Sequence, residues 1–134
     1  NPAETGRLIS EAPEGFEVYS GDDALTLCLL AMGAVGVIGV ATHWAAVEHQ
    51  RMIAAFQAGD VARARELHVA LLPSFDYETS IAAPNPIPTK CLLRSIGLPV
   101  GHGRAPMDVT PDGLEKHARA VLAGTELGRE LGIV

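Results

Sequence analysis

The chain has 134 residues, of which 48% are apolar and only 4% aromatic, and its formal net charge is −6. This length and apolar content suffice for one compact core packed mainly by aliphatic side chains. The ten Lys and Arg residues are scattered along the chain, which argues against a nucleic-acid partner. Cys28 and Cys91 each lie alone in an apolar run, so we expect buried thiols in a reducing cytosol and no disulfide.

Neither a signal peptide nor a membrane span is predicted from the sequence. The longest apolar stretch, 24–46, is interrupted by Gly33, Gly36 and Gly39, and a helix followed by a strand explains it better. We therefore expect a cytoplasmic protein. The chain starts at Asn1 without an initiator Met, which suggests that it is part of a longer protein.

The first half of the chain alternates between helical and strand-like patterns. A short helix is expected over 3–10, a strand near 16–20, a helix over 24–32 that ends at Gly33, and a second strand near 35–40. Consecutive apolar residues in the second strand are typical of a strand buried on both faces of a parallel sheet. A helix over 44–58 follows, with Val47, Met52, Ile53 and Phe56 on its inner side.

The second half contains no convincing strand. Asp60 is expected to cap a helix whose inner side carries Val61, Ala64, Leu67, Leu71 and Leu72. Further helices are expected over 88–96, closed by Gly97, and after the Thr110-Pro111 start signal. We therefore divide the chain into 1–59, with the β/α units, and a helical region over 60–134.

Two parallel strands do not form a stable sheet alone, and both strands here are predicted to be buried on two faces. The missing strands point to an α/β fold that continues upstream, either a β/α barrel, which needs eight strands and about 250 residues, or a doubly wound sheet. A small protein that completes its sheet by forming an oligomer is the alternative.

Working groups of β/α barrels lie at the carboxyl ends of the strands. Here those ends carry Gly21 and Asp22 after the first strand, and Ile38 and Gly39 at the end of the second. In a functional interpretation the backbone of Gly21, Ile38 and Gly39 faces a small ligand and Asp22 orders the rim. In a purely structural interpretation Asp22 and Asp23 cap a helix and the glycines relieve crowding.

The remaining candidate side chains lack a partner in the sequence pattern. His43 follows a strand, but no acid or nucleophile is paired with it, so a structural role is favoured. His49, His68, His102 and His117 lack metal-ligand spacing and are expected on solvated faces. The only lysines, Lys90 and Lys116, fall within helices, where no burial lowers an amine pKa for Schiff-base chemistry.

Three ordered stretches resemble the dihydrodipicolinate synthase (4-hydroxy-tetrahydrodipicolinate synthase) family: Tyr19-Ser20-Gly21-Asp22-Asp23-Ala24, then Gly33-Ala34-Val35-Gly36-Val37-Ile38-Gly39-Val40, and Pro84-Asn85-Pro86-Ile87-Pro88-Thr89-Lys90. The resemblance covers nearly the whole chain, and the proline-rich stretch is its most specific part. It implies the last two β/α units of a TIM barrel followed by a carboxyl-terminal helical appendage.

By this resemblance the parent protein is a class I aldolase-type lyase that condenses pyruvate with aspartate semialdehyde and uses no cofactor or metal. Pyruvate is held as a Schiff base on a lysine that would lie upstream of Asn1, so this chain has no catalytic residue and is expected to be inactive alone. Ile38, Gly21, Asp22 and Gly39 would contribute to substrate binding. The resemblance also implies a homo-oligomer, a tetramer in many relatives.

The sequence departs from the family pattern at Ala83, where Glu is common, at Gly39, where Ser is frequent, and in extra residues between Pro73 and Pro84. These departures leave open a sister pyruvate-dependent aldolase, such as N-acetylneuraminate lyase or a keto-deoxy-sugar aldolase. A non-catalytic interaction module is a separate alternative.

Overall fold

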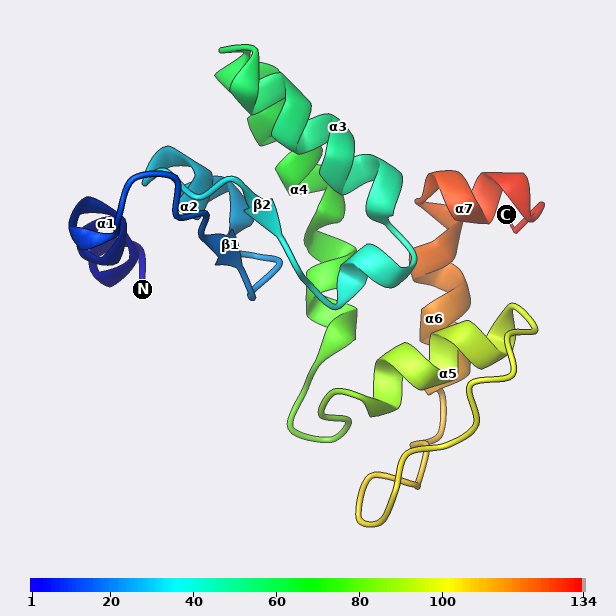
Figure 1. Cartoon of the computed structure of the whole chain (residues 1–134). Coiled ribbons are helices and arrows are strands. Elements are labelled where there is room, and N and C mark those ends of the chain that lie inside the picture. The colour runs from blue at the N-terminus through cyan, green and yellow to red at the C-terminus, as the bar shows by residue number, and fades with distance from the viewer. Residues whose placement is uncertain (134) are drawn as a thin grey trace.

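The computed structural model describes residues 1–133 and shows a mainly helical chain with one small parallel sheet (Figure 1). The elements in chain order are α1 (Pro2–Glu11), β1 (Tyr19–Ser20), α2 (Thr26–Ala31), β2 (Gly36–Val37), η1 (Ala41–His43), α3 (Ala46–Gln57), α4 (Val61–Glu78), α5 (Ile87–Ser95), α6 (Leu114–Ala123) and α7 (Glu126–Glu130). The predicted alternation of helices and strands, followed by a helical second half, is confirmed.

The two strands pair in parallel, with Tyr19 opposite Gly36 and Ser20 opposite Val37. The amide of Ile38 donates to the carbonyl of Ser20 at 2.8 Å, which extends the ladder beyond the carboxyl end of β2. Both strands are shorter than predicted, because each has only one neighbour within residues 1–133 and the flanking residues find no second ladder. The parallel pairing itself was predicted correctly.

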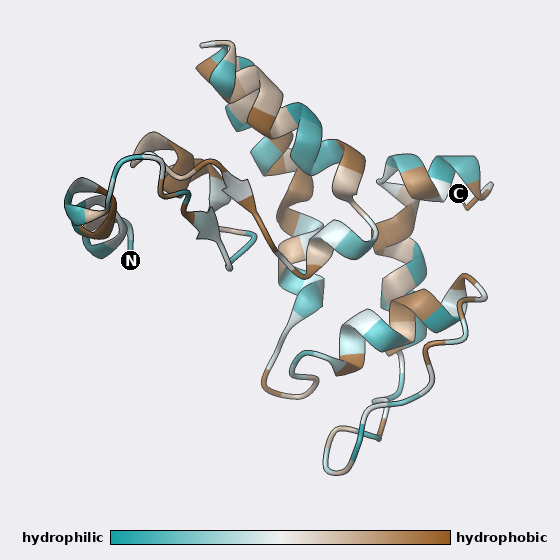
Figure 2. Cartoon of the chain, viewed as in Figure 1, coloured by the Kyte–Doolittle hydropathy of each residue, from teal (hydrophilic) through white to brown (hydrophobic). Residues whose placement is uncertain are grey.

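The prediction that both strands are buried on two faces is wrong for this structure. Phe16 is 61% exposed, Tyr19 45% and Ile38 75%. Figure 2 shows apolar ribbon in α2 and in the segment that leaves β2, and in Figure 1 these elements lie beside α1, at one side of the helical bundle. The side chains are exposed because no other element of residues 1–133 covers this part of the sheet.

Helix α2 ends as predicted next to Gly33, whose positive φ of 105° is a conformation that glycine adopts readily. Leu29 and Leu30 are buried on one side of this helix. Cys28 is exposed, so its predicted burial is wrong, whereas Cys91 in α5 is buried as expected. Helical periodicity explains the error, because Cys28 precedes the buried pair and faces away from it.

Helices α3 and α4 pack along each other in the centre of the molecule (Figure 1). Asp60 caps α4 as predicted, since its Oδ1 accepts from the amide of Arg63 at 3.0 Å. The buried side of the pair includes Met52, Ala64 and Leu71 as predicted. The predicted inner residues Val47, Val61 and Leu72 are exposed, because the buried stripe is narrower than the apolar pattern suggests.

Helix α4 continues through Pro73 to Glu78, beyond the predicted end of the apolar pattern. The added turn connects three elements. The indole Nε1 of Trp44 donates to Ser74 at 3.0 Å, and the hydroxyl of Tyr77 donates to the carbonyl of Pro88 at 2.9 Å. These buried bonds hold the segment after η1 and the start of α5 against the end of α4.

The predicted helix over 88–96 appears as α5, and Gly97 follows it with a φ of 87°. The last predicted helix, α6, begins at Leu114 behind Gly113 and not at Thr110. Helix α7 was not predicted; the Thr125 hydroxyl caps it by accepting from the amide of Gly128 at 3.1 Å. Its five residues are too few for a periodic apolar pattern.

The hydrophobic core lies where η1 and helices α3 to α6 meet. It consists of buried residues from all of these elements and from the segments around them: Ala41, Trp44, Ala45, Met52, Ala64, Leu71, Phe75, Tyr77, Leu92, Leu93, Ala118, Val121 and Leu122. This core is contiguous with the segment that leaves β2, so the helical region fixes the direction in which that segment leaves the sheet. Among residues 1–133 no helix is both long and apolar enough to cross a membrane.

Candidate functional site

The four residues predicted to bind substrate lie at one edge of the small sheet. Gly21 and Asp22 directly follow β1, and Ile38 and Gly39 directly follow β2. Parallel pairing brings the two carboxyl ends together, and the hydrogen bond from Ile38 to Ser20 joins them. The structure therefore places all four residues on adjoining segments.

Each residue has a distinct environment at this edge. A Cβ added to Gly21 would meet no atom within 4 Å, so open space surrounds that backbone. The Oδ1 atom of Asp22 accepts from the amide of Leu25 at 3.1 Å, which fixes the turn before α2 and does not cap the helix itself. Ile38 projects into solvent, whereas Gly39 lies directly against the carboxylate of Asp23.

Asp23 is the best-buried acid of the site, with 0% exposure. Its Oδ2 atom accepts a 2.6 Å hydrogen bond from the amide of Val40, which joins the start of α2 to the segment that follows β2. Burial opposes ionisation of this carboxyl group, but its contact with His49 and its bond from Val40 prevail, and the pKa of Asp23 is lowered. Asp23 is therefore a buried carboxylate.

His49 contacts Asp23 from α3. Its Nε2 lies 3.0 Å from Oδ1 of Asp23, and its Nδ1 lies 2.8 Å from the carbonyl of Ala45. This distance places the imidazole within ion-pair range of the buried carboxylate. Burial favours the neutral ring, but Asp23 and the Ala45 carbonyl outweigh it and raise the pKa of His49.

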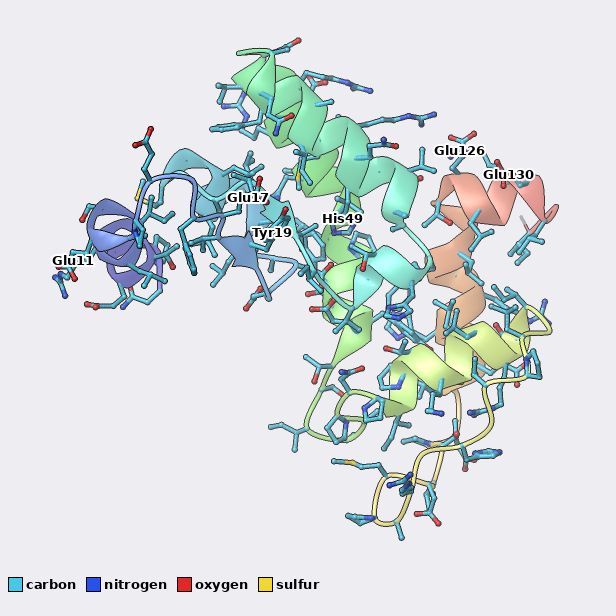
Figure 3. All side chains as sticks on the ribbon, viewed as in Figure 1. Glu11, Glu17, Tyr19, His49, Glu126 and Glu130 are labelled. Atoms are coloured by element: carbon cyan, nitrogen blue, oxygen red, sulfur yellow. The ribbon has the colours of Figure 1, made fainter. Side chains whose placement is uncertain are left out.

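The expectation that His49 and His68 lie on solvated faces is wrong. His49 is 1% exposed, and both imidazole rings pack against Phe75 of α4. Figure 3 shows the His49 side chain directed into the interior between its own helix and α4. A signal was present in the sequence, because His49 precedes Met52 by three residues and so shares its inward side of the helix.

Glu78 brings a second carboxyl group to this interior cluster from the end of α4. Burial and the neighbouring Asp23 carboxylate raise the pKa of Glu78 to about 7. Its Oε2 atom is buried and has no hydrogen-bond partner among the residues that the structure describes. Asp23, His49 and Glu78, which we call the buried acid–histidine cluster, therefore join three segments distant in sequence.

His43 lies on the other side of this segment. Its Nδ1 lies 2.8 Å from the carbonyl of Val40, and the residue helps to line a hollow of about 300 Å³ together with Asn85, Thr89 and Lys90. The lining residues of this hollow include no carboxylate. The structural role predicted for His43 agrees with this environment.

Both lysines lie in helices, as expected. The Nζ atom of Lys90 donates to the carbonyl of Val100 at 2.7 Å, which fixes the loop after α5, and Lys116 is exposed on α6. Neither lies at the carboxyl end of β1 or β2. Within the described part of the chain, no group of three or more His, Cys, Asp or Glu residues is arranged to hold a metal ion.

Comparison with known sequences identifies relatives along most of the chain. Residues 3–124 match the Dihydrodipicolinate synthetase family. The chain is 50% identical over 101 residues to the 4-hydroxy-tetrahydrodipicolinate synthase of Listeria welshimeri, covering 75% of this chain and 34% of that protein. It is 45% identical over 124 residues to the enzyme of the same name from Symbiobacterium thermophilum, covering 90% of this chain and 42% of that protein.

Solved structures agree with the sequence relatives. A DHDPS from Cyanidioschyzon merolae with lysine bound superposes with a TM-score of 0.85 at 36% identity, covering 95% of this chain and 42% of that chain. A dihydrodipicolinate synthase from Bacillus anthracis gives a TM-score of 0.81 at 38% identity, covering 91% of this chain and 41% of that one. The chain thus spans about 34 to 42% of the length of these relatives.

These similarities confirm the predicted fold class, in which the last two β/α units of a TIM barrel are followed by a helical appendage. They also explain why only two strands pair and why their faces are exposed, since the relatives are more than twice as long. The three ordered motifs of the sequence fall within the matched residues. The chain belongs to the dihydrodipicolinate synthetase family.

Proposed function

We propose that this chain forms the carboxyl-terminal part of a lyase that condenses pyruvate with aspartate semialdehyde, a step of lysine and diaminopimelate biosynthesis. The observation that carries the proposal is the family match over residues 3–124, together with relatives at 45 to 50% identity that are named 4-hydroxy-tetrahydrodipicolinate synthase. No separate observation favours a sister aldolase or a non-catalytic module.

In this proposal Gly21, Asp22, Ile38 and Gly39 form part of the wall that faces pyruvate. Their position at the joined carboxyl ends of β1 and β2 supports the assignment, because barrel enzymes place substrates at that end. The open space around Gly21 leaves its backbone accessible to a small anion, and Asp22 fixes the turn beside it. We call these four residues the pocket wall.

The Schiff base forms when a neutral lysine amine attacks the ketone of pyruvate and water leaves. We propose that this lysine lies outside the 134 residues and that the chain alone is inactive. The environments of Lys90 and Lys116 support this view, since one is bound to the Val100 carbonyl and the other is solvated on α6. The proposed chemistry requires neither a cofactor nor a metal ion.

Three further features belong to the proposal. Residues 1–59 supply the end of the barrel and residues 60–134 the helical region. The enzyme works in the cytoplasm, and it assembles as a homo-oligomer, a tetramer by family resemblance. The buried thiol of Cys91 is compatible with a reducing compartment. Size measurements on the longer protein test the oligomeric state.

The proposal can be tested by a chimera in which this chain replaces the matching part of the Listeria welshimeri synthase, to which it is 50% identical over 101 residues. We expect turnover with pyruvate and aspartate semialdehyde and none with N-acetylneuraminate or keto-deoxy-sugar acids. The unmodified host and a host truncated before the matching part are the controls. A folded chimera that cleaves a sugar acid, or that accepts no aldehyde, would contradict the proposal.

A further inference from the structure

The segment that carries Ile38 and Gly39 is bonded on both sides. On one side the amide of Ile38 donates to Ser20, which fixes the segment to β1. On the other side the amide of Val40 donates to Asp23, in a 2.6 Å bond to a fully buried carboxylate. The orientation of the peptide between Gly39 and Val40 therefore depends on where the Asp23 side chain lies.

Gly39 makes room for this arrangement. A Cβ at position 39 would overlap both carboxylate oxygens of Asp23, so any other residue forces the acid to move. Because the backbone of Gly39 does not have a positive φ, conformational freedom is not what requires glycine here. The requirement is steric and comes from Asp23.

His49 keeps the Asp23 side chain in this position. The ring is 1% exposed. Its Nδ1 contacts the Ala45 carbonyl, and the ring of Phe75 packs against it at a tilt. The Nε2 atom of His49 therefore presents a fixed polar partner 3.0 Å from Oδ1, while Oδ2 remains available to Val40. Without a polar partner at this point, a buried carboxylate would be strongly disfavoured.

We propose that His49 is a positioning residue that acts through Asp23 to hold the pocket wall at Ile38 and Gly39. The inference rests on the proposed function where it assigns substrate binding to the pocket wall. The contacts that link His49 to Val40 through Asp23 do not depend on that function. The helical region takes part as well, since Glu78 and Phe75, which packs against the His49 ring, come from α4. The helices thereby set the geometry of the barrel end.

The charged groups around His49 are few. Asp23 faces it from the start of α2, Glu78 and His68 approach it from α4, and Asp22 acts on the cluster through Glu78. Glu78 holds its proton more tightly beside the Asp23 carboxylate. Deprotonation of the cluster at higher pH should therefore loosen the bond to Val40.

The first test is hydrogen exchange at the Val40 amide in dilute samples of the 134-residue chain. His49→Leu removes the polar partner of Asp23 at similar volume, and His49→Gln retains an N–H donor for Asp23. We expect Val40 to exchange about tenfold faster in His49→Leu and to return close to the parent rate in His49→Gln. Val121→Ala, a core variant on α6 that does not touch Asp23, His49 or Val40 through any hydrogen bond, is the control for general destabilisation. It should increase exchange at Val40 no more than at other core amides.

A second measurement uses the unmodified chain and does not depend on the stability of any variant. The proton shift of the Val40 amide should titrate with the same midpoint as the ring signals of His49. If His49→Leu leaves Val40 protected, or if the Val40 amide does not follow the His49 titration, the inference is overturned.

The third measurement links the positioning role to catalysis. In the chimera, His49→Leu should raise KM for pyruvate about tenfold with a smaller effect on kcat, and His49→Gln should restore it. Unchanged KM in a folded His49→Leu chimera would refute the link to the pocket wall. An unmodified chimera without activity would instead count against the proposed function, and the exchange result at Val40 would still decide the structural inference.

Discussion

Glu78→Gln should make the protein more stable at alkaline pH and leave it nearly unchanged at acidic pH. The pKa of Glu78 is raised from an ordinary 4.5 to about 7 by burial and by the neighbouring Asp23. Because the folded pKa of Glu78 is raised, the free energy of unfolding is highest where this carboxyl group is protonated, below pH 4.5. This stability is lost as the pH rises through about 7, where the buried group ionises. The amide introduced by Glu78→Gln cannot ionise, so the variant should avoid the loss.

The magnitude follows from the shift. A displacement from 4.5 to about 7 corresponds to about 3 kcal/mol, which we reduce to roughly 1–2 kcal/mol because water reaches part of this side chain. His49 adds a slope of the same sign, since its raised pKa means that its ion pair with Asp23 weakens as the ring loses its proton. Asp23, with a lowered pKa, loses its contribution only as the pH falls below about 4.

Urea unfolding at pH 5 and pH 8, followed by circular dichroism, measures these free energies. We expect the parent to lose stability between the two pH values and Glu78→Gln to lose about 1–2 kcal/mol less. Glu66→Gln, on the exposed side of α4, is the matched control and should behave as the parent. Equal pH dependence in the parent and in Glu78→Gln would refute the reasoning.

Three other predictions concern packing and association. Trp44→Phe should cost about 1–2 kcal/mol in urea unfolding, because Ser74 loses its indole partner in the core. Leu122→Ala should cost about 2–5 kcal/mol in the same assay, since this side chain is 0% exposed, and a loss below about 1 kcal/mol would contradict the packing described. The chain should self-associate with rising concentration in sedimentation experiments through the open edges of β1 and β2, and a strictly monomeric chain would contradict this.

The order of the elements could be predicted because each boundary has a local cause. Asp60 caps α4 and Gly33 closes α2 through interactions within a few residues, which a sequence pattern contains. The parallel pairing could be predicted as well, since strands separated by a helix can pair in only one direction without a long return. The ordered motifs then identified the family.

The buried acid–histidine cluster could not be predicted in the same way. Asp23, His49 and Glu78 are separated by 26 and 29 positions, and no local rule connects them. The adjacent acids Asp22 and Asp23 suggested one shared role as helix caps, whereas Asp22 bonds the turn before α2 and Asp23 is buried. The contact depends on how α3 and α4 pack on the sheet end, which is tertiary information.

The exposure of the sheet also could not be predicted from the sequence pattern. Val35 to Val40 has the composition of a strand covered on both faces, and the relatives that are more than twice as long show that such a segment belongs to a larger fold. Within residues 1–133 no element covers the exposed side chains of this segment. The pattern predicted burial on both faces, which the structure does not show.

Borohydride reduction with pyruvate tests the central claim most directly, namely that the chain supplies a pocket wall and no nucleophile. The 134-residue chain and the active chimera are each treated with pyruvate and sodium borohydride, digested and mapped by mass spectrometry. We predict a reduced adduct on a lysine of the host segment in the chimera, and no adduct on Lys90 or Lys116 in either sample. Specific labelling of Lys90 or Lys116 that depends on pyruvate would contradict the account.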